Sequence, residues 1–492
     1  MMIKTKLLSS LALISSILWV QGCTTSPLNE VTADPQKPVK NILFIAVDDL
    51  RPELKSFGAT HIHSPNIDAL AANSRMFYNH YVNAPSCGPS RYSLLTGRYG
   101  PTSNDALKAR SKALKKSKDE VPASMPAWFK SKGYTTIAVG KVSHYPGGNM
   151  GKNWNDPSQP ELPDGWTKSL MPVAEWETPK GAMHGLAHGE IRKKASDMDV
   201  FQATEGGDNI YPDGLITDEA IKQLEQLTKE PEKPFFLAVG LIKPHLPFGA
   251  PKKYLDLYNG VTFPENPYPN KPKGPSTWFN SNEFMKYNRW GKNPITDEAF
   301  AESVRRHYAA CVSYADAQVG KILQALKASG ADKNTIVVLW GDHGWNLGEH
   351  GMWGKHNLYE EGLKSPLLIA YPGIPQPGKS TDAVVETADI FPTLTKLTGL
   401  PMPEQPHGQS LIDSLNDPNA QGHAAYAYAY WRHNHTIRMG NFRLTHMGKK
   451  GVALYDLASQ EKETKNVAAE HPELVKTMMK ALQAKMKQRD KF

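Results

Sequence analysis

Short apolar runs alternate with segments of helical periodicity along most of the chain. Four of the runs are rich in β-branched and aromatic residues, as buried strands are. Apolar positions at helical spacing predict helices over residues 218–229 and 304–326. Continuous apolar strands alternating with helices predict an α/β fold, with a large, mostly parallel sheet sandwiched by helices and buried on both faces. The predicted strands cover residues 42–47, 135–139, 235–239 and 335–340.

Each of these four strands is followed by polar side chains that can carry chemistry. The carboxyl ends of parallel strands meet at one edge of a sheet, and ligands bind just beyond that edge. We therefore expect the four clusters to form a single site. In chain order its side chains are Asp48, Asp49, Lys141, His144, His245, Asp342 and His343.

The last quarter of the chain has a different pattern. A Pro/Gly-rich stretch at residues 372–380 predicts a boundary, and a small α+β unit follows it. We expect a catalytic domain over 41–375 and a smaller C-terminal subdomain over 376–492. The elements predicted in this subdomain are strands at 424–431, 436–439 and 442–446 and a helix at 472–487.

The N-terminus is typical of a targeting segment. Two lysines precede an apolar run, 7–20, that is too short to span a bilayer as a permanent helix. Val20 to Cys23 then resembles a bacterial lipobox, in which the cysteine carries lipid. We expect a signal peptide over 1–22, a tether over 23–40, and a lipoprotein held in the periplasm or outer membrane by lipid on Cys23. An ordinary signal peptide is the alternative.

Composition excludes several classes of protein. With 22% charged and 40% hydrophobic residues, the chain of 492 residues is neither disordered, collagenous nor a coiled coil. Lys and Arg outnumber Asp and Glu by 57 to 49, but the excess is spread along the chain, so we expect no nucleic acid partner. Of the three cysteines, Cys311 lies within the predicted helix 304–326 and is expected to be a buried apolar side chain.

Three carboxylates at the predicted site point to a metal. Asp48, Asp49 and Asp342 would repel one another in a shared pocket unless a divalent cation lay between them. Oxygen ligands favour Ca²⁺ or Mg²⁺, whereas His343 would also suit a transition metal. The alternative is that the paired aspartates form a turn and Asp342 caps a helix.

The segment around Cys87 predicts a pocket for an oxyanion. Pro89 suits the first turn of a helix and Gly97 its end, which places Cys87 at the helix N-terminus. Arg91, four residues later, lies on the same face. Backbone N–H groups, the helix dipole and Arg91 would together stabilise a tetrahedral anion beside a nucleophile. A reactive thiol or a buried structural cysteine are the plainer interpretations.

Cys87 to Arg91 reads Cys-Gly-Pro-Ser-Arg, the C-x-P-S-R signature of the type I sulfatases, and Leu95 to Arg98 matches its continuation. The chain resembles this family of the alkaline-phosphatase-like superfamily, and in its motifs it is most similar to the iduronate-2-sulfatase group. Further matching strings occur in the family's order along the mature chain. They are Gly140-Lys141, Lys243-Pro244-His245, Gly341-Asp342-His343-Gly344, Lys355, Tyr359-Glu360-Glu361-Gly362 and Leu454-Tyr455-Asp456-Leu457.

The resemblance implies an alkaline-phosphatase-like fold and a set of roles. Cys87 would be oxidised to formylglycine by a separate maturation enzyme, and formylglycine 87 would join the metal ligands around one Ca²⁺ ion. Lys141 and Lys355 would bind the sulfate, and His245 would protonate the leaving oxygen. The implied metal ligands are Asp48, Asp49, Cys87, Asp342 and His343, and the implied catalytic residues are Cys87, Arg91, Lys141, His144, His245 and Lys355.

The implied function is hydrolysis of sulfate esters on a sulfated polysaccharide or its oligosaccharides. The glycan would contain uronic acid, as ulvan and the glycosaminoglycans do, or would be an algal galactan such as carrageenan. A phosphatase or phosphonate monoester hydrolase of the same superfamily is one alternative, and a non-catalytic glycan-binding lipoprotein is another.

Overall fold

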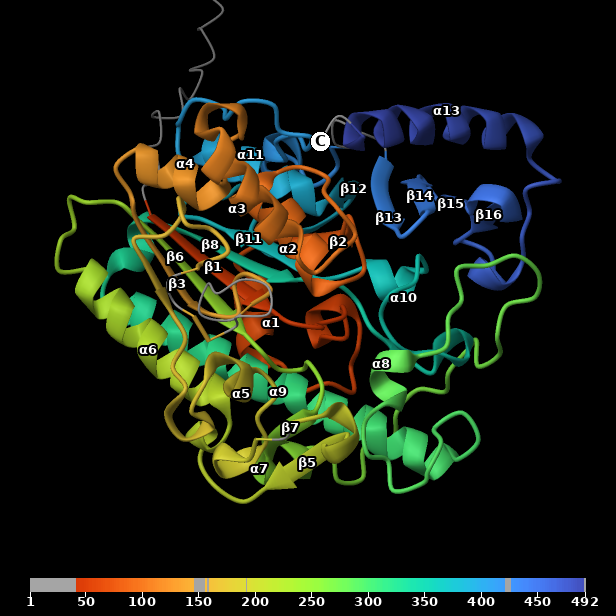
Figure 1. Ribbon diagram of the computed structural model, residues 1–492, viewed down its shortest axis with the longest axis horizontal. Coiled ribbons are helices and arrows are strands. Elements are labelled where there is room, and N and C mark those ends of the chain that lie inside the picture. Colours follow the sequence, from red (N-terminus) through yellow and green to blue (C-terminus); the bar gives the residue numbers. More distant parts are fainter. Residues whose placement is uncertain (1–40, 146–154, 157–158, 192, 421–425, 491–492) are drawn as a thin grey trace, which may run out of the picture. The chain divides into compact units, whose positions relative to one another are not determined.

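An eight-stranded sheet forms the centre of the structure, a computed structural model that describes residues 41–145, 155–156, 159–191, 193–420 and 426–490 (Figure 1). Its strands are β1 Asn41–Val47, β2 Arg75–Tyr81, β3 Thr135–Gly140, β4 Lys168–Leu170, β6 Phe235–Leu241, β8 Thr335–Gly341, β11 Leu367–Ala370 and β12 Ser380–Glu386. Across the sheet they follow the order β12-β2-β11-β8-β1-β6-β3-β4. Strand β11 is antiparallel to both neighbours, and the other pairs are parallel, so the mostly parallel sheet is confirmed.

The four predicted strands are β1, β3, β6 and β8, and they lie side by side in the middle of this sheet. Every residue of β1 is buried. Alternate side chains of a strand point to opposite faces, and those of β1 enter two separate apolar cores: Leu43 and Ile45 one, Ile42 and Phe44 the other. Both faces of the sheet are therefore covered, which is why the run is apolar throughout.

Helices cover the two faces. In Figure 1, α6 and α9 lie on one side of the central strands, and α2, α3, α4 and α11 on the other. The longest described helix, α9, is capped by Asp297, whose side chain accepts a hydrogen bond from Phe300 N, and it buries Cys311 as predicted. The helices of the main body are α1 Pro65–Ala71, α2 Cys87–Thr96, α3 Ala106–Lys116, α4 Met125–Ser131, α5 Pro179–Met183, α6 Pro212–Leu227, α7 Lys252–Asp256, α8 Asn282–Met285, α9 Glu298–Ala328, α10 Glu360–Leu363, α11 Ile390–Leu397 and α12 Ile412–Asn416.

A four-stranded antiparallel sheet follows near the C-terminus, and helix α13, Pro472–Arg489, packs on it through Met478 and Leu482. The predicted strands at 436–439 and 442–446 and the closing helix are confirmed, and the predicted strand at 424–431 is confirmed from Tyr426 on, because residues 424 and 425 lie outside the described residues. Residues 380–386 form β12, which pairs with β2 at one edge of the large sheet. The domain boundary near 376 stays a prediction. The small sheet consists of β13 Tyr426–Trp431, β14 Asn434–Met439, β15 Phe442–His446 and β16 Val452–Asp456, and two further short pairs are β5 Phe201–Thr204 with β7 Phe248–Pro251 and β9 Asn346–Leu347 with β10 Trp353–Gly354.

The predicted signal peptide over 1–22 and tether over 23–40 lie outside the described residues. Within the part of the chain that the structure describes, no helix combines the length and the apolar character needed to cross a membrane.

A buried ion cluster joins the small sheet to α10. Arg443 of β15 contacts the carboxylate of Glu360, the first residue of α10, and its Nε lies 3.1 Å from Glu463 Oε1. Burial opposes ionisation of Glu360, but the charges of Arg443, Lys364 and Arg438 together outweigh it and lower the pKa of this carboxyl to about 2. Burial raises the pKa of Glu463 to about 8. Glu360 is therefore the ionised partner of Arg443 at neutral pH.

We expect the Arg443→Met variant to lose stability, because it removes the nearest cation of the Glu360 carboxylate and leaves only the more distant Arg438, whose Nε lies 3.8 Å from Glu360 Oε1. Breaking a buried pair from one side costs about 3–5 kcal/mol, and we expect the low end because Glu360 is partly exposed. Thermal unfolding should show a clearly lower midpoint than in Lys449→Met, a matched change at an exposed turn. Equal midpoints for the two variants would show that the ion cluster does not hold the small sheet.

Candidate active site

The carboxyl ends of β8, β1, β6 and β3 meet at one edge of the sheet and bring the predicted side chains together. Asp48 follows β1, Lys141 follows β3 and Asp342 follows β8, and all three are completely buried. His245 lies beyond β6 and is also buried. The strand-end pattern therefore located the cluster, although the role of each residue remains a prediction.

Arg91 connects three of these strand ends. Its Nη2 lies 3.1 Å from Asp48 Oδ1 and 3.0 Å from Asp342 Oδ2, and its Nη1 donates to the carbonyls of Lys141 and Val142. The guanidinium is fully buried, and both carboxylates raise its pKa despite the burial. Arg91 therefore acts on Asp48 and Asp342 and positions them.

Asp49 has an unusual backbone. Its φ of 59° lies in the left-handed region, which is rare outside glycine and common at functional sites. Two hydrogen bonds hold it there: Asp49 N donates to Asp342 Oδ1 at 2.9 Å, and the Tyr308 hydroxyl donates to Asp49 O at 2.8 Å. The strained turn directs the Asp49 carboxylate toward the same centre as Asp48.

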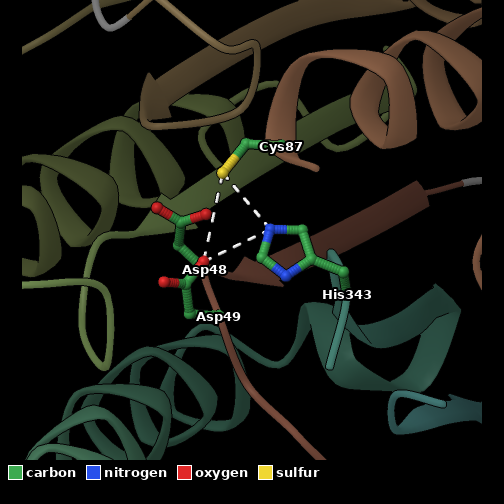
Figure 2. A group of neighbouring side chains, drawn as sticks. All are labelled: Asp48, Asp49, Cys87 and His343. Atoms are coloured by element: carbon green, nitrogen blue, oxygen red, sulfur yellow. Dashed lines mark hydrogen bonds and ion pairs between the residues drawn. The ribbon is translucent and has the colours of Figure 1, made fainter. Parts of the chain in front are cut away.

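Four side chains converge on that centre, as Figure 2 shows. One potential ligand atom from each of Asp48, Asp49, Cys87 and His343 lies within 4.8 Å of the others. Asp49 Oδ2 is buried and has no hydrogen-bond partner among the described residues. His343 Nδ1 contacts the Gly344 carbonyl at 3.0 Å, so in the neutral ring Nδ1 carries the proton and Nε2 presents a lone pair. This donor set fits a divalent cation.

Two ammonium groups also reach the Cys87 sulfur. Lys355 Nζ lies 3.3 Å from Cys87 Sγ and 2.8 Å from Asp49 Oδ1. Lys141 Nζ lies 3.9 Å from Sγ and contacts the Asp48 carboxylate. Any anionic group attached to residue 87 would therefore lie between two cations.

The thiol itself is poorly suited to act as a nucleophile. Burial and the Asp48 charge raise the pKa of Cys87 well above its usual range, although Lys141 and Lys355 oppose them. A neutral buried thiol attacks poorly because the thiolate is the reactive form. The reactive-thiol interpretation of the sequence therefore loses support.

Helix α2 begins at Cys87, as Pro89 and Gly97 predicted, and Gly97 ends it with a φ of 63°. Asn104 holds the first turn, because its Oδ1 accepts from Gly88 N at 3.2 Å. A Cβ on Gly88 would lie 2.4 Å from Asn104 Cα, so only glycine fits beside the cysteine. Nothing in the sequence pattern identified Asn104.

Of the two predicted histidines, His245 presents Nε2 toward the site, because its Nδ1 contacts the Leu246 carbonyl at 2.6 Å. His144 lies on the loop after Lys141, and burial together with the charge of Lys141 lowers its pKa well below the usual value. The sequence did not identify Glu283 of α8, whose Oε1 lies 3.7 Å from His245 Nε2 and 3.6 Å from Lys355 Nζ.

Comparison with known proteins finds similar sequences and a similar fold. The family model "Sulfatase" matches residues 40–400, and "N-sulphoglucosamine sulphohydrolase, C-terminal" matches 348–491. A sulfatase of Formosa agariphila is 31% identical over 91% of this chain and 86% of its own length. Mouse iduronate 2-sulfatase (Mus musculus) is 34% identical over 74% of this chain and 69% of its own. This relative agrees with the predicted similarity to the iduronate-2-sulfatase group.

A solved structure, the phosphonate monoester hydrolase of Agrobacterium radiobacter, has the same fold. It superposes with a TM-score of 0.69, covers 91% of this chain and 96% of its own, and is 21% identical. At that identity the likeness concerns the fold, and it confirms the alkaline-phosphatase-like architecture implied by the motifs.

We expect Ca²⁺ to raise the melting temperature of chelator-treated protein, because only the folded state assembles the ligands. At a hundredfold excess over Kd the gain is about 2.7 kcal/mol, or several degrees. Asp49→Asn should abolish the shift, since Asp49 supplies the unpaired oxygen. Asp316→Asn, a matched change of a buried carboxylate that instead accepts from Asn66 and Ile67, should keep it. An undiminished shift in Asp49→Asn would rule out this cation site.

Proposed function

Since the chain belongs to the sulfatase family, whose members are sulfuric ester hydrolases, we propose that it removes sulfate groups from a sulfated polysaccharide or its oligosaccharides. The observation that carries this proposal is the convergence of Lys141 and Lys355 on Cys87 beside three carboxylates. The two lysines would bind an anionic ester, and the carboxylates would hold a metal ion next to the atom that is attacked. The mouse relative, which is named iduronate 2-sulfatase, supports a sulfated carbohydrate as the substrate class.

We propose that Cys87 is converted to formylglycine by a separate enzyme, and that the cation is Ca²⁺. The hydrated aldehyde would supply an oxygen nucleophile, and the cation would favour its deprotonation. Asp48, Asp49, Asp342 and His343 would hold the cation together with residue 87. Arg91 keeps Asp48 and Asp342 in place from the opposite side of the cluster.

The remaining residues would bind the sulfate and transfer protons. Lys141 and Lys355 would exchange their carboxylate contacts for the sulfate oxygens and stabilise charge in the transition state. Burial and the charge of Lys141 lower the pKa of His245, and an anionic substrate between them would reverse part of that effect. His245 Nε2 could then give its proton to the leaving sugar oxygen. His144 would accept the proton released when sulfate departs.

The fold shared with a phosphonate monoester hydrolase keeps that activity as a second candidate. Sulfate and phosphonate esters have similar shapes, and the two lysines would attract either one. A non-catalytic glycan-binding protein is the third candidate, and it would leave Cys87 as a thiol.

We expect sulfate release from a panel of sulfated polysaccharides and oligosaccharides by protein co-produced with a maturation enzyme. Cys87→Ala should lower the rate more than about a thousandfold, because it removes the nucleophilic residue. Cys311→Ala, the matched change of a buried cysteine in α9, should keep activity. Ion chromatography would measure sulfate, and mass spectrometry would report the state of residue 87. Faster turnover of matched phosphonate esters, or full activity in Cys87→Ala, would contradict the proposal.

We also propose that the protein is an exported lipoprotein held at the membrane through Cys23, on the support of the lipobox-like sequence alone. Cys23→Ser should move the protein from the membrane fraction to the soluble fraction of the cell envelope. A wild-type protein that is already soluble after fractionation would contradict the anchor and favour an ordinary signal peptide.

A further inference from the structure

Glu283 brings a carboxylate to the two side chains that the ester would meet first. It is the second residue of α8, and its Oε1 lies 3.6 Å from Lys355 Nζ and 3.7 Å from His245 Nε2. Lys355 Nζ in turn lies 3.3 Å from Cys87 Sγ. Under the proposed function, Lys355 binds the sulfate and His245 protonates the leaving oxygen. An acidic side chain therefore contacts both groups that an anionic ester has to reach.

Both contacts of Glu283 are loose. A hydrogen bond from nitrogen to oxygen spans about 2.7–3.2 Å, so charge attraction acts between Glu283 and these two side chains without a hydrogen bond. The second oxygen, Oε2, is buried and has no hydrogen-bond partner among the described residues. Asp49, which also contacts Lys355, differs because its Oδ1 accepts a hydrogen bond at 2.8 Å. Of these two carboxylates, Glu283 is the one that Lys355 can release at the lower cost.

The side chain of Glu283 also reaches solvent. It is 28% exposed, whereas the side chains of Asp48 and Asp49 are completely buried. A carboxylate that turns away from Lys355 would therefore enter water, where its charge is well solvated. Glu283 connects the buried cluster around Lys355 with solvent.

The short helix that carries Glu283 is held in place by its neighbours. Phe284 is buried, and its ring lies 5.7 Å from the ring of Trp353. Ser281, which precedes the helix, accepts a hydrogen bond from Trp353 N through its Oγ at 2.8 Å. A change of rotamer at Glu283 would thus release Lys355 without any movement of α8.

Glu283 and a bound sulfate would exclude one another. A sulfate oxygen at Lys355 Nζ would lie close to the Glu283 carboxylate, which is 3.6 Å from the same nitrogen. Two anions so close together repel strongly where little water lies between them. Movement of the Glu283 side chain into solvent would end the repulsion and free Lys355 and His245 for the ester.

We propose that Glu283 competes with the sulfate group for Lys355 and His245. In the free protein its carboxylate pairs with Lys355 and faces His245, and a bound sulfate group displaces it into solvent. The proposal rests on the proposed function and adds a residue that controls how tightly the anion is held. The ester and the released sulfate bear the same cost of displacement, but only the ester gains contacts through its sugar. Glu283 therefore favours release of the product.

The test measures the binding of inorganic sulfate to the matured, Ca²⁺-loaded protein by calorimetry, which requires no turnover. Glu283→Gln keeps the shape of the side chain and removes its charge. Glu219→Gln in α6 is the matched control, because Glu219 is 22% exposed and its carboxylate likewise lies 3.6 Å from a lysine, Lys222. Thermal unfolding shows that each variant is folded.

We expect Glu283→Gln to bind sulfate about tenfold more tightly than the wild type at low salt, because the anion no longer has to displace a charge. Glu219→Gln should match the wild type, and added salt should narrow the difference. Inorganic sulfate should also inhibit ester hydrolysis by Glu283→Gln at an about tenfold lower concentration.

A crystal structure of the wild type with bound sulfate tests the displacement without any variant. A sulfate oxygen should lie within hydrogen-bond distance of Lys355 Nζ, and the Glu283 carboxylate should have turned away from this nitrogen.

The remaining outcomes separate the two proposals. Equal sulfate affinity in Glu283→Gln and the wild type, an equal gain in Glu219→Gln, or a sulfate at Lys355 with Glu283 still in contact overturns the competition and leaves the sulfatase activity standing. Tighter sulfate binding by Glu283→Gln without hydrolysis of any sulfate ester, with residue 87 shown to be converted, overturns the proposed function and leaves the competition for an anion standing.

Discussion

The buried guanidinium of Arg91 is the interaction on which the rest of the site depends. It binds carboxylates that end two different strands, Asp48 and Asp342, and two carbonyls that follow a third. A buried carboxylate without a partner is costly, so these strand ends could not meet at one point without a cation between them. Lysine could not replace Arg91, because only the planar fork serves four acceptors at once.

The pKa values of the two carboxylates that contact Arg91 differ. Although burial opposes it, Lys141 joins Arg91 at Asp48, and together they lower the pKa of Asp48 well below the usual range. Burial and the neighbouring Asp48 raise the pKa of Asp342 to about 7 despite its contact with the same guanidinium. The protein charges alone therefore favour ionisation of Asp48 over that of Asp342. A divalent cation in the cluster would favour the ionised form of Asp342 as well.

The central strands and the residues at their ends could be predicted, because strand periodicity and the meeting of parallel carboxyl ends are local rules. The motif around Cys87 predicted its helix for the same reason. The antiparallel direction of β11 could not be predicted, since a short apolar run fits either direction. Glu283 could not be predicted, because it lies in α8 within a long stretch of short elements that has no periodic pattern.

The three cations of the site are buried. Arg91, Lys141 and Lys355 lie where water is excluded, and charges there interact strongly and hold a fixed geometry. An anion that binds beside residue 87 would therefore meet cations that the carboxylates of the cluster already hold in position.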